Sequence, residues 1–188
     1  MAYIDKTAFQ ARITNNVHDD LANVAGLYQA SSVNADCSAG LLCVRGAQTP
    51  CEGFSGIYNE NTFYMTASAA GAEEVIYACD THEAQLLSGK AGSYFIGTET
   101  LGLGVPAGRE GNFCRINFDA QSVYRFGEGN ISGTVLESTQ YFTIENGLLK
   151  VAAAAPESGK YFELRGTGTF TEGTVASFTY YDVVGHIA

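Results

Sequence analysis

Tryptophan is absent from this chain of 188 residues, and proline occurs only three times. The missing tryptophan argues against a carbohydrate-binding module, because Trp offers the largest aromatic face with a polar handle. Cations are also few: 10 Lys and Arg stand against 20 Asp and Glu, no two of these cations are adjacent, and the formal net charge is −10. Nucleic-acid binders concentrate positive charge to neutralise phosphates, so the sequence predicts no nucleic-acid partner.

Long apolar runs are missing as well. No stretch approaches the roughly 20 apolar residues that cross a bilayer, and the opening residues, MAYIDKTAFQARITNN, lack the apolar segment of a secretory signal. We therefore expect a protein made inside the cell, with no membrane partner. The cysteines at positions 37, 43, 51, 79 and 114 are then expected to be reduced thiols that serve as small core residues, because disulfides persist mainly in oxidising compartments.

Signatures of catalysis and metal binding are scarce. The spacing of the first three cysteines matches no zinc pattern, in which ligands are usually paired two to four residues apart. Of the three histidines, His18 and His82 lie beside carboxylates and His186 lies near the C-terminus. Adjacent residues on a strand point to opposite faces, so such neighbours do not converge on one ion without a tight turn. The sequence predicts no metal site and no cofactor.

Nucleophilic catalysis is equally poorly supported. Cys79 lies near His82, but Asp80 and Glu83 surround the pair with negative charge, whereas a catalytic thiol needs an electropositive setting. The Gly102–Gly108 segment resembles a nucleotide loop, yet Ala107 stands where the third glycine belongs. We predict that the protein is not an enzyme and has no catalytic residues, and we interpret carboxylate pairs such as Glu73 and Glu74 as exposed charge.

What the chain does contain is typical of a sheet protein: 11 Tyr, 11 Phe and 22 Gly. Aromatic side chains fit pleated surfaces and glycine fits tight turns. Many short apolar runs alternate with turn residues, which predicts a mainly β fold, an antiparallel sandwich or one or more small barrels. We expect an extended or partly helical N-terminal arm over residues 1–30, a β-rich subdomain over 31–105, and a second over 106–188. The Gly-rich 100–111 segment is the expected hinge.

The expected strands are short and lie throughout the chain after residue 39. They are Gly40–Arg45, Thr62–Thr66, Glu74–Ala78, Ser93–Gly97, Asn112–Phe118, Ser122–Phe126, Tyr141–Ile144, Leu148–Ala152, Lys160–Arg165, Gly168–Thr171 and Ala176–Val184. The Asn146-Gly147 pair between two of them predicts a two-residue hairpin. A second hairpin is expected through Gly166–Gly168. Of the adjacent aromatics Tyr94-Phe95 and Tyr180-Tyr181, one member of each pair should face the core.

The C-terminal half resembles structural proteins of tailed bacteriophages. The resemblance lies in Tyr141-Phe-Thr-Ile-Glu-Asn-Gly-Leu-Leu-Lys-Val-Ala-Ala-Ala-Ala-Pro, in Tyr161-Phe-Glu-Leu and in Thr98-Glu-Thr-Leu-Gly-Leu-Gly-Val-Pro-Ala-Gly. Within that group the chain is most similar in style to head decoration (capsid cement) proteins. The resemblance implies a virion component on the exterior of the head, often a homotrimer, which is assembled in the host cytoplasm, binds the major capsid protein and stabilises its lattice. Residues 2–30 and the 101–111 loop are the expected capsid contacts.

Three other interpretations remain open at this stage. One is a tail-tube or head–tail joining subunit, in which an acidic ring lumen would let DNA pass. A second is a carbohydrate-binding module, which the Tyr- and Phe-rich sheet suggests despite the absence of Trp. The third is a cysteine or serine hydrolase, because catalytic triads are assembled in space and leave no obligatory local pattern.

Overall fold

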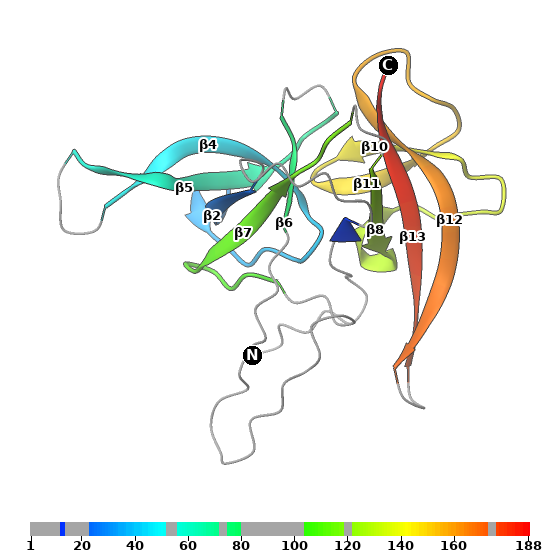
Figure 1. Cartoon of the computed structure of the whole chain (residues 1–188), viewed down its shortest axis with the longest axis horizontal. Coiled ribbons are helices and arrows are strands. Elements are labelled where there is room, and N and C mark those ends of the chain that lie inside the picture. Colours follow the sequence, from blue (N-terminus) through cyan, green and yellow to red (C-terminus); the bar gives the residue numbers. More distant parts are fainter. Residues whose placement is uncertain are drawn as a thin grey trace.

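The computed structural model describes residues 12–13, 23–51, 56–71, 75–79, 104–118, 122–172 and 176–188. These residues form two sheets, and the mainly β prediction is confirmed (Figure 1). Most of the expected N-terminal arm and the expected strand Ser93–Gly97 lie outside the described residues.

The first sheet closes into a small barrel. Strands follow one another in the order β2-β5-β4-β6-β7, and β7 pairs back with β2. The pairing of β2 with β5 is parallel, and the other pairings in the ring are antiparallel. The strands are β2 (Asn23–Ala30), β4 (Leu42–Pro50), β5 (Tyr58–Ala67), β6 (Tyr77–Cys79) and β7 (Glu110–Arg115), with the short β3 (Val33–Asn34) beside β2.

Strand β2 was not expected, because residues 1–30 were assigned to the arm. Its sequence, NVAGLYQA, is interrupted by Gly26, which weakens the strand pattern. In the barrel this glycine is required: a Cβ atom there would lie 2.3 Å from Met65 and 2.6 Å from Phe113. Those two buried side chains fill the space that Gly26 leaves. Residues 23–30 are therefore part of the barrel wall and do not belong to an arm.

The second sheet has the strand order β1-β8-β13-β12-β10-β11-β9, and all its pairings are antiparallel except that of β9 with β11. A single 3-10 turn, η1 (Glu128–Asn130), separates β8 from β9. The strands are β1 (Arg12–Ile13), β8 (Val123–Gly127), β9 (Ile131–Ser132), β10 (Tyr141–Glu145), β11 (Leu148–Ala152), β12 (Lys160–Glu172) and β13 (Ala176–Ile187).

The boundary between the two sheets lies later in the chain than the expected division at residue 105. Strand β7 follows that boundary and still belongs to the barrel, so the chain passes from one sheet to the other between Arg115 and Val123. Within the described part of the expected hinge, Gly104 and Val105 lie against the barrel. Val105 and Cys37 exchange backbone hydrogen bonds of 2.7 and 2.8 Å, and a Cβ on Gly104 would collide with the Cys37 carbonyl.

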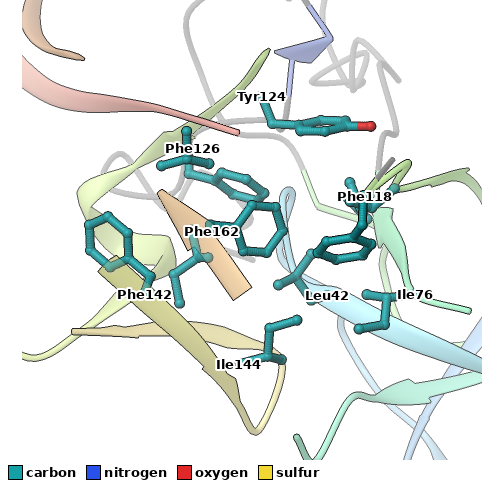
Figure 2. Close-up of a cluster of buried hydrophobic side chains, with 12 residues drawn as sticks. Leu42, Ile76, Phe118, Tyr124, Phe126, Phe142, Ile144 and Phe162 are labelled. Carbon is teal, nitrogen blue, oxygen red and sulfur yellow. The ribbon is translucent and has the colours of Figure 1, made fainter. Parts of the chain in front are cut away.

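One hydrophobic core joins the sheets. Leu42, Ile76 and Ala78 from the barrel side pack with aromatic residues of the second sheet (Figure 2). Phe162 lies in the middle, with ring centroids 5.1 Å from Phe118 and 5.9 Å from Phe126. A second cluster, which includes Tyr28, Cys37, Cys43, Met65, Cys79 and Phe113, fills the barrel itself.

The Asn146-Gly147 turn is the second connection between the sheets. Both residues have positive φ, 52° and 79°, as a two-residue hairpin requires, so the predicted turn is confirmed. Asn146 is exposed, whereas Gly147 is buried against the barrel. Its N–H donates to the Ser68 carbonyl at 2.7 Å, and its own carbonyl accepts from the Leu42 N–H at 2.8 Å.

The expected hairpin at Gly166–Gly168 is wrong. Strand β12 runs without a turn from Lys160 to Glu172 and pairs with β13 along its length, with a bulge between Leu164 and Gly166. The Gly-Thr-Gly sequence is part of a strand because Tyr180, opposite Gly168, occupies the space where a side chain would be. In Figure 1 this long ribbon extends beyond the rest of the second sheet.

Candidate interaction surface

The outer face of the second sheet carries a connected set of polar and aromatic contacts. Side chains alternate along a strand, and Phe162, Val183, Tyr124 and Phe142 point into the shared core. Their neighbours in sequence point the other way. We call this surface the outer face, and it consists of Arg125, Tyr141, Tyr161, Glu163, Tyr180, Asp182 and His186.

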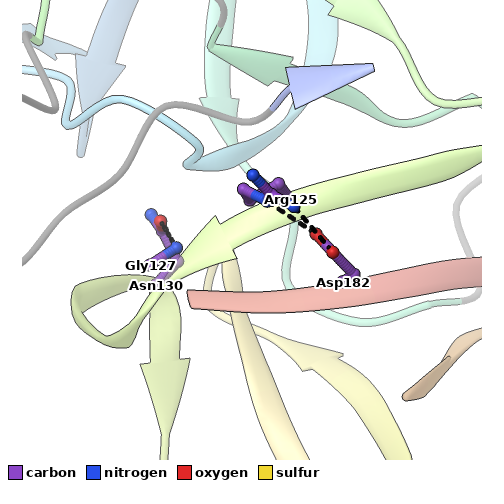
Figure 3. Close-up of polar contacts among 4 residues, drawn as sticks. All are labelled: Arg125, Gly127, Asn130 and Asp182. Atoms are coloured by element: carbon purple, nitrogen blue, oxygen red, sulfur yellow. Dashed lines mark hydrogen bonds and ion pairs between the residues drawn. The ribbon is translucent and has the colours of Figure 1, made fainter. Parts of the chain in front are cut away.

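Arg125 and Asp182 form the strongest polar pair on the outer face. Nε of Arg125 donates to Oδ1 of Asp182 at 2.7 Å, and a terminal guanidinium nitrogen donates to Oδ2 at 2.8 Å (Figure 3). The side chains are 30% and 23% exposed, respectively. The hydrogen bonds that Arg125 donates to Asp182 raise the pKa of Arg125 above its ordinary value. The bidentate geometry fixes the plane of the guanidinium group.

Tyr180 completes a stack with this pair. The guanidinium carbon of Arg125 lies 3.8 Å from the centroid of the Tyr180 ring, a cation–π contact. On the neighbouring strand, a Cβ built on Gly168 would lie 2.4 Å from the same ring. The ring therefore lies flat across β12, and the glycine makes room for it. Arg125 thus contacts the Asp182 carboxylate through its edge and the Tyr180 ring through its face.

The second group on the outer face is aromatic. The Tyr161 ring stacks on His186 with centroids 5.3 Å apart and planes at 23°, and Tyr141 meets Tyr161 edge-on at 6.1 Å. Oε2 of Glu163 lies 3.1 Å from a guanidinium nitrogen of Arg165 and 3.0 Å from Nε2 of His186. That imidazole nitrogen is covered and makes no hydrogen bond to any described residue, so its contact with the carboxylate becomes an ion pair only when His186 is protonated.

These residue types favour binding over chemistry. Tyr and Arg are enriched at the centres of protein interfaces, where large side chains with little freedom add contact area at low entropic cost. No three His, Cys, Asp or Glu side chains within the described ranges are grouped so that they could hold a metal ion. The outer face is therefore a candidate docking surface.

The described residues that the sequence analysis considered lie in different parts of the structure. Tyr181 packs against the shared core, 6.4 Å from Phe142, while Tyr180 faces outward, as expected for an adjacent pair on a strand. Cys79 is buried in the barrel core. Its suggested partner His82 lies outside the described residues, as do His18, Glu73, Glu74 and the Tyr94-Phe95 pair.

The cysteines are all thiols in the structure, and four of the five are buried. Cys37, Cys43 and Cys79 belong to the barrel core cluster together with Tyr28. A hydrogen bond with Cys43, aided by burial, raises the pKa of the Cys37 thiol well above its ordinary value. A protonated, buried thiol is a poor nucleophile, so this cluster has the character of core packing.

The 101–111 loop, one of the expected contacts, is described from Gly104 onward. Asp36 fixes it to the barrel by accepting a hydrogen bond from the Ala107 N–H at 2.7 Å. Residues 107–110 are exposed on the turn that leads into β7. The loop thus presents a well-anchored surface segment.

Sequence reasoning missed the outer face. Arg125 and Asp182 are 57 positions apart and meet only because β8 pairs with β13. The one local signal was the adjacent pair Tyr180-Tyr181, which indicates one outward-facing aromatic residue.

Comparison of the chain with protein-family models, with curated proteins and with solved structures gave no match. Among the described residues, no helix has the length and apolar character that a membrane span requires.

Proposed function

We propose that the protein is a non-enzymatic structural subunit of a tailed-bacteriophage particle. It binds the outer surface of the assembled head through contacts with the major capsid protein and stabilises the capsid lattice. The observation that carries the proposal is the outer face of the second sheet, where Tyr, Arg and carboxylate side chains are held in a half-exposed, pre-arranged network. Pre-arranged aromatic and guanidinium groups lose little freedom on docking to a protein surface.

Mass action supplies the mechanism. A protein that binds neighbouring capsid subunits only in their assembled arrangement stabilises that arrangement by its binding free energy, about 2.7 kcal/mol per site at a hundredfold excess over Kd. Many such sites on one shell add up to substantial reinforcement. The net charge of −10 is compatible with an exterior position, because packaged DNA repels an acidic protein.

A second candidate is a tail-tube or head–tail joining subunit. The long β12–β13 ribbon favours it, because a two-stranded ribbon that extends beyond its own sheet offers backbone edges to a neighbouring subunit in a ring. The two candidates differ in symmetry. A head decoration protein forms three-fold clusters on a shell, whereas a tail-tube or joining subunit forms closed rings or tubes.

The test is to add the purified protein to expanded heads of the phage that encodes it, prepared without the protein, and to image them by cryo-electron microscopy. We expect periodic new density on the shell. The variant Tyr161→Ala should reduce occupancy at least tenfold, while Thr66→Ala, an exposed position on the barrel, should bind like the original protein. Bare shells would refute the head assignment, and rings or tubes of the protein alone would support the tail assignment.

A further inference from the structure

Strand β12 has an edge that no described strand covers. On the side away from β13, β12 pairs with β10 only at Phe162 and Glu163, and the N–H of Leu164 donates to the Gln140 carbonyl at 2.8 Å. The bulge between Leu164 and Gly166 follows at once. Beyond it β12 continues to Glu172, paired with β13 alone within the described part of the chain (Figure 1).

The direction of the backbone groups on this edge follows from the ladder. Leu164 donates toward β10, so Leu164 and its partner Val183 form a pair whose backbone groups point away from each other. Such pairs alternate with hydrogen-bonded pairs along an antiparallel ladder. The backbone groups of Tyr181 and Thr179 on β13 therefore also point away from β12, as those of Val183 do.

The partners of these two residues on β12 are Thr167 and Thr169. Their N–H and C=O groups point out of the sheet, away from β13, and Thr171 follows by the same alternation. Three outward-facing residues in a row form a regular template for another strand. Both Thr167 and Thr169 are exposed.

Apart from the bulge at its start, the edge lacks the features that normally prevent pairing. Natural proteins protect exposed edges with bulges, lysine, proline or a covering segment. From Gly166 to Thr171 the sequence reads Gly-Thr-Gly-Thr-Phe-Thr, without a charge or a proline. Because the net charge of the protein is −10, an uncharged edge lets two copies approach without like charges meeting at the contact.

We propose that this edge pairs with the same edge of a second copy of the chain, antiparallel, around a two-fold axis at Thr169. Thr169 then faces Thr169 of the second copy, and Thr167 faces Thr171. Each facing pair exchanges both backbone hydrogen bonds, and threonine opposite threonine is a favourable cross-strand combination. The proposal concerns self-association and does not depend on the capsid partner proposed above.

The absence of charge along this edge favours a second copy as the occupant. In the two-fold register the uncharged segment Thr167–Thr171 of one copy lies opposite the same segment of the other. No like charges meet within the register. The contact joins copies in pairs, whereas the resemblance to decoration proteins implied a trimer.

The test uses the purified protein alone, by analytical ultracentrifugation over a concentration series up to about 100 µM. We expect a concentration-dependent dimer. Thr169→Lys and Thr169→Glu should each weaken dimerisation at least tenfold, because the axis places two like charges opposite each other. An equimolar mixture of the two variants should restore the dimer, since Lys then faces Glu.

The matched controls are Thr66→Lys and Thr66→Glu, at an exposed position on the barrel, which should dimerise like the original protein, alone and mixed. Circular dichroism and the melting temperature verify that every variant is folded. A monomer throughout the concentration range overturns the proposal. So does a dimer that tolerates both Thr169 variants, or a mixture that stays monomeric. Failure to bind heads has no bearing on this result.

Discussion

The carbonyl oxygen of Gly147 accepts a hydrogen bond from the main-chain N–H of Leu42 at 2.8 Å, although the two residues lie in different sheets. A tight hairpin turn thus serves as the joint between the barrel and the second sheet. Asn130 supports the same joint, because its side-chain amide donates to the Ala39 carbonyl at 2.8 Å while its oxygen accepts from the Gly127 N–H (Figure 3).

Replacement of Gly147 should weaken this joint. In Gly147→Ala the new Cβ would lie 2.8 Å from Cδ1 of Leu41 and 2.9 Å from the Leu42 carbonyl oxygen, and φ stays at +79°. We expect a loss of about 2–4 kcal/mol in the free energy of unfolding, measured with urea. Gly56→Ala is the matched control: its φ is +77° but nothing lies within 4 Å, so it should lose only about 1 kcal/mol. Equal losses would contradict the role of the close approach.

Gly168 and Gly166 form a second matched pair. A Cβ at Gly168 would collide with the Tyr180 ring, whereas a Cβ at Gly166 meets nothing within 4 Å. Gly168→Ala should displace the ring from Arg125 and cost about 1–3 kcal/mol in thermal unfolding. Gly166→Ala should change stability by less than about 1 kcal/mol, because it mainly reduces the freedom of the unfolded chain. A tolerated Gly168→Ala together with a harmful Gly166→Ala would contradict the packing described for Tyr180.

The shared core predicts that both sheets unfold in one step. Phe162 is fully buried among residues of both sheets, and Phe162→Ala should lower the free energy of unfolding by about 3–5 kcal/mol. Calorimetry should show a single transition in the original protein, shifted to lower temperature in the variant. Two separate transitions, with only one affected by the substitution, would mean that the sheets fold as independent domains.

We expect the protein to lose stability at alkaline pH because of the buried phenol of Tyr28. Burial, with the neighbouring Cys43 and Cys37 thiols, raises the pKa of its phenol to about 12, against 10.0 for an ordinary tyrosine. Below pH 10 both the folded and the unfolded states keep the proton. Between pH 10 and 12 the unfolded chain ionises first, so the free energy of unfolding falls as pH rises through this window.

The ultraviolet absorbance of tyrosinate measures this effect. Burial also raises the pKa values of Tyr124 and Tyr181, so more than one phenol should titrate late, and Tyr28→Phe should remove one phenol from the late part of the titration. Titration of all eleven tyrosines in one step near pH 10 would contradict the assignment.

Local patterns predicted much of the second sheet. Leu148–Ala152 has the expected bounds, and Tyr141–Glu145 differs by one residue, because an Asn-Gly turn between β-prone runs is specified by backbone conformation alone. The same local reasoning failed at Gly166–Gly168 and at β2. In both places the sequence suggests a break at a glycine, but a neighbouring side chain fills the space beside that glycine. Tyr180 fills it at Gly168, and Met65 and Phe113 fill it at Gly26.

The outer face was beyond local reasoning for a different reason. Its members come from β8, β10, β12 and β13, and only the pairing of these strands brings Arg125 to Asp182 or Tyr141 to Tyr161. Period-two alternation tells which residues share a face of one strand, but the register between strands is set by distant contacts.

The docking of the Asn146-Gly147 hairpin on the barrel also affects when the apolar surface of the barrel is covered during synthesis. A ribosome releases the barrel strands first, and at that moment Leu42, Ile76 and Ala78 are only partly covered, because Phe142, Phe162 and Val183 are still to come. The nascent barrel therefore exposes an apolar wall until the last strands of the second sheet emerge. Anyone who wishes to produce the barrel by itself must first give that wall polar side chains.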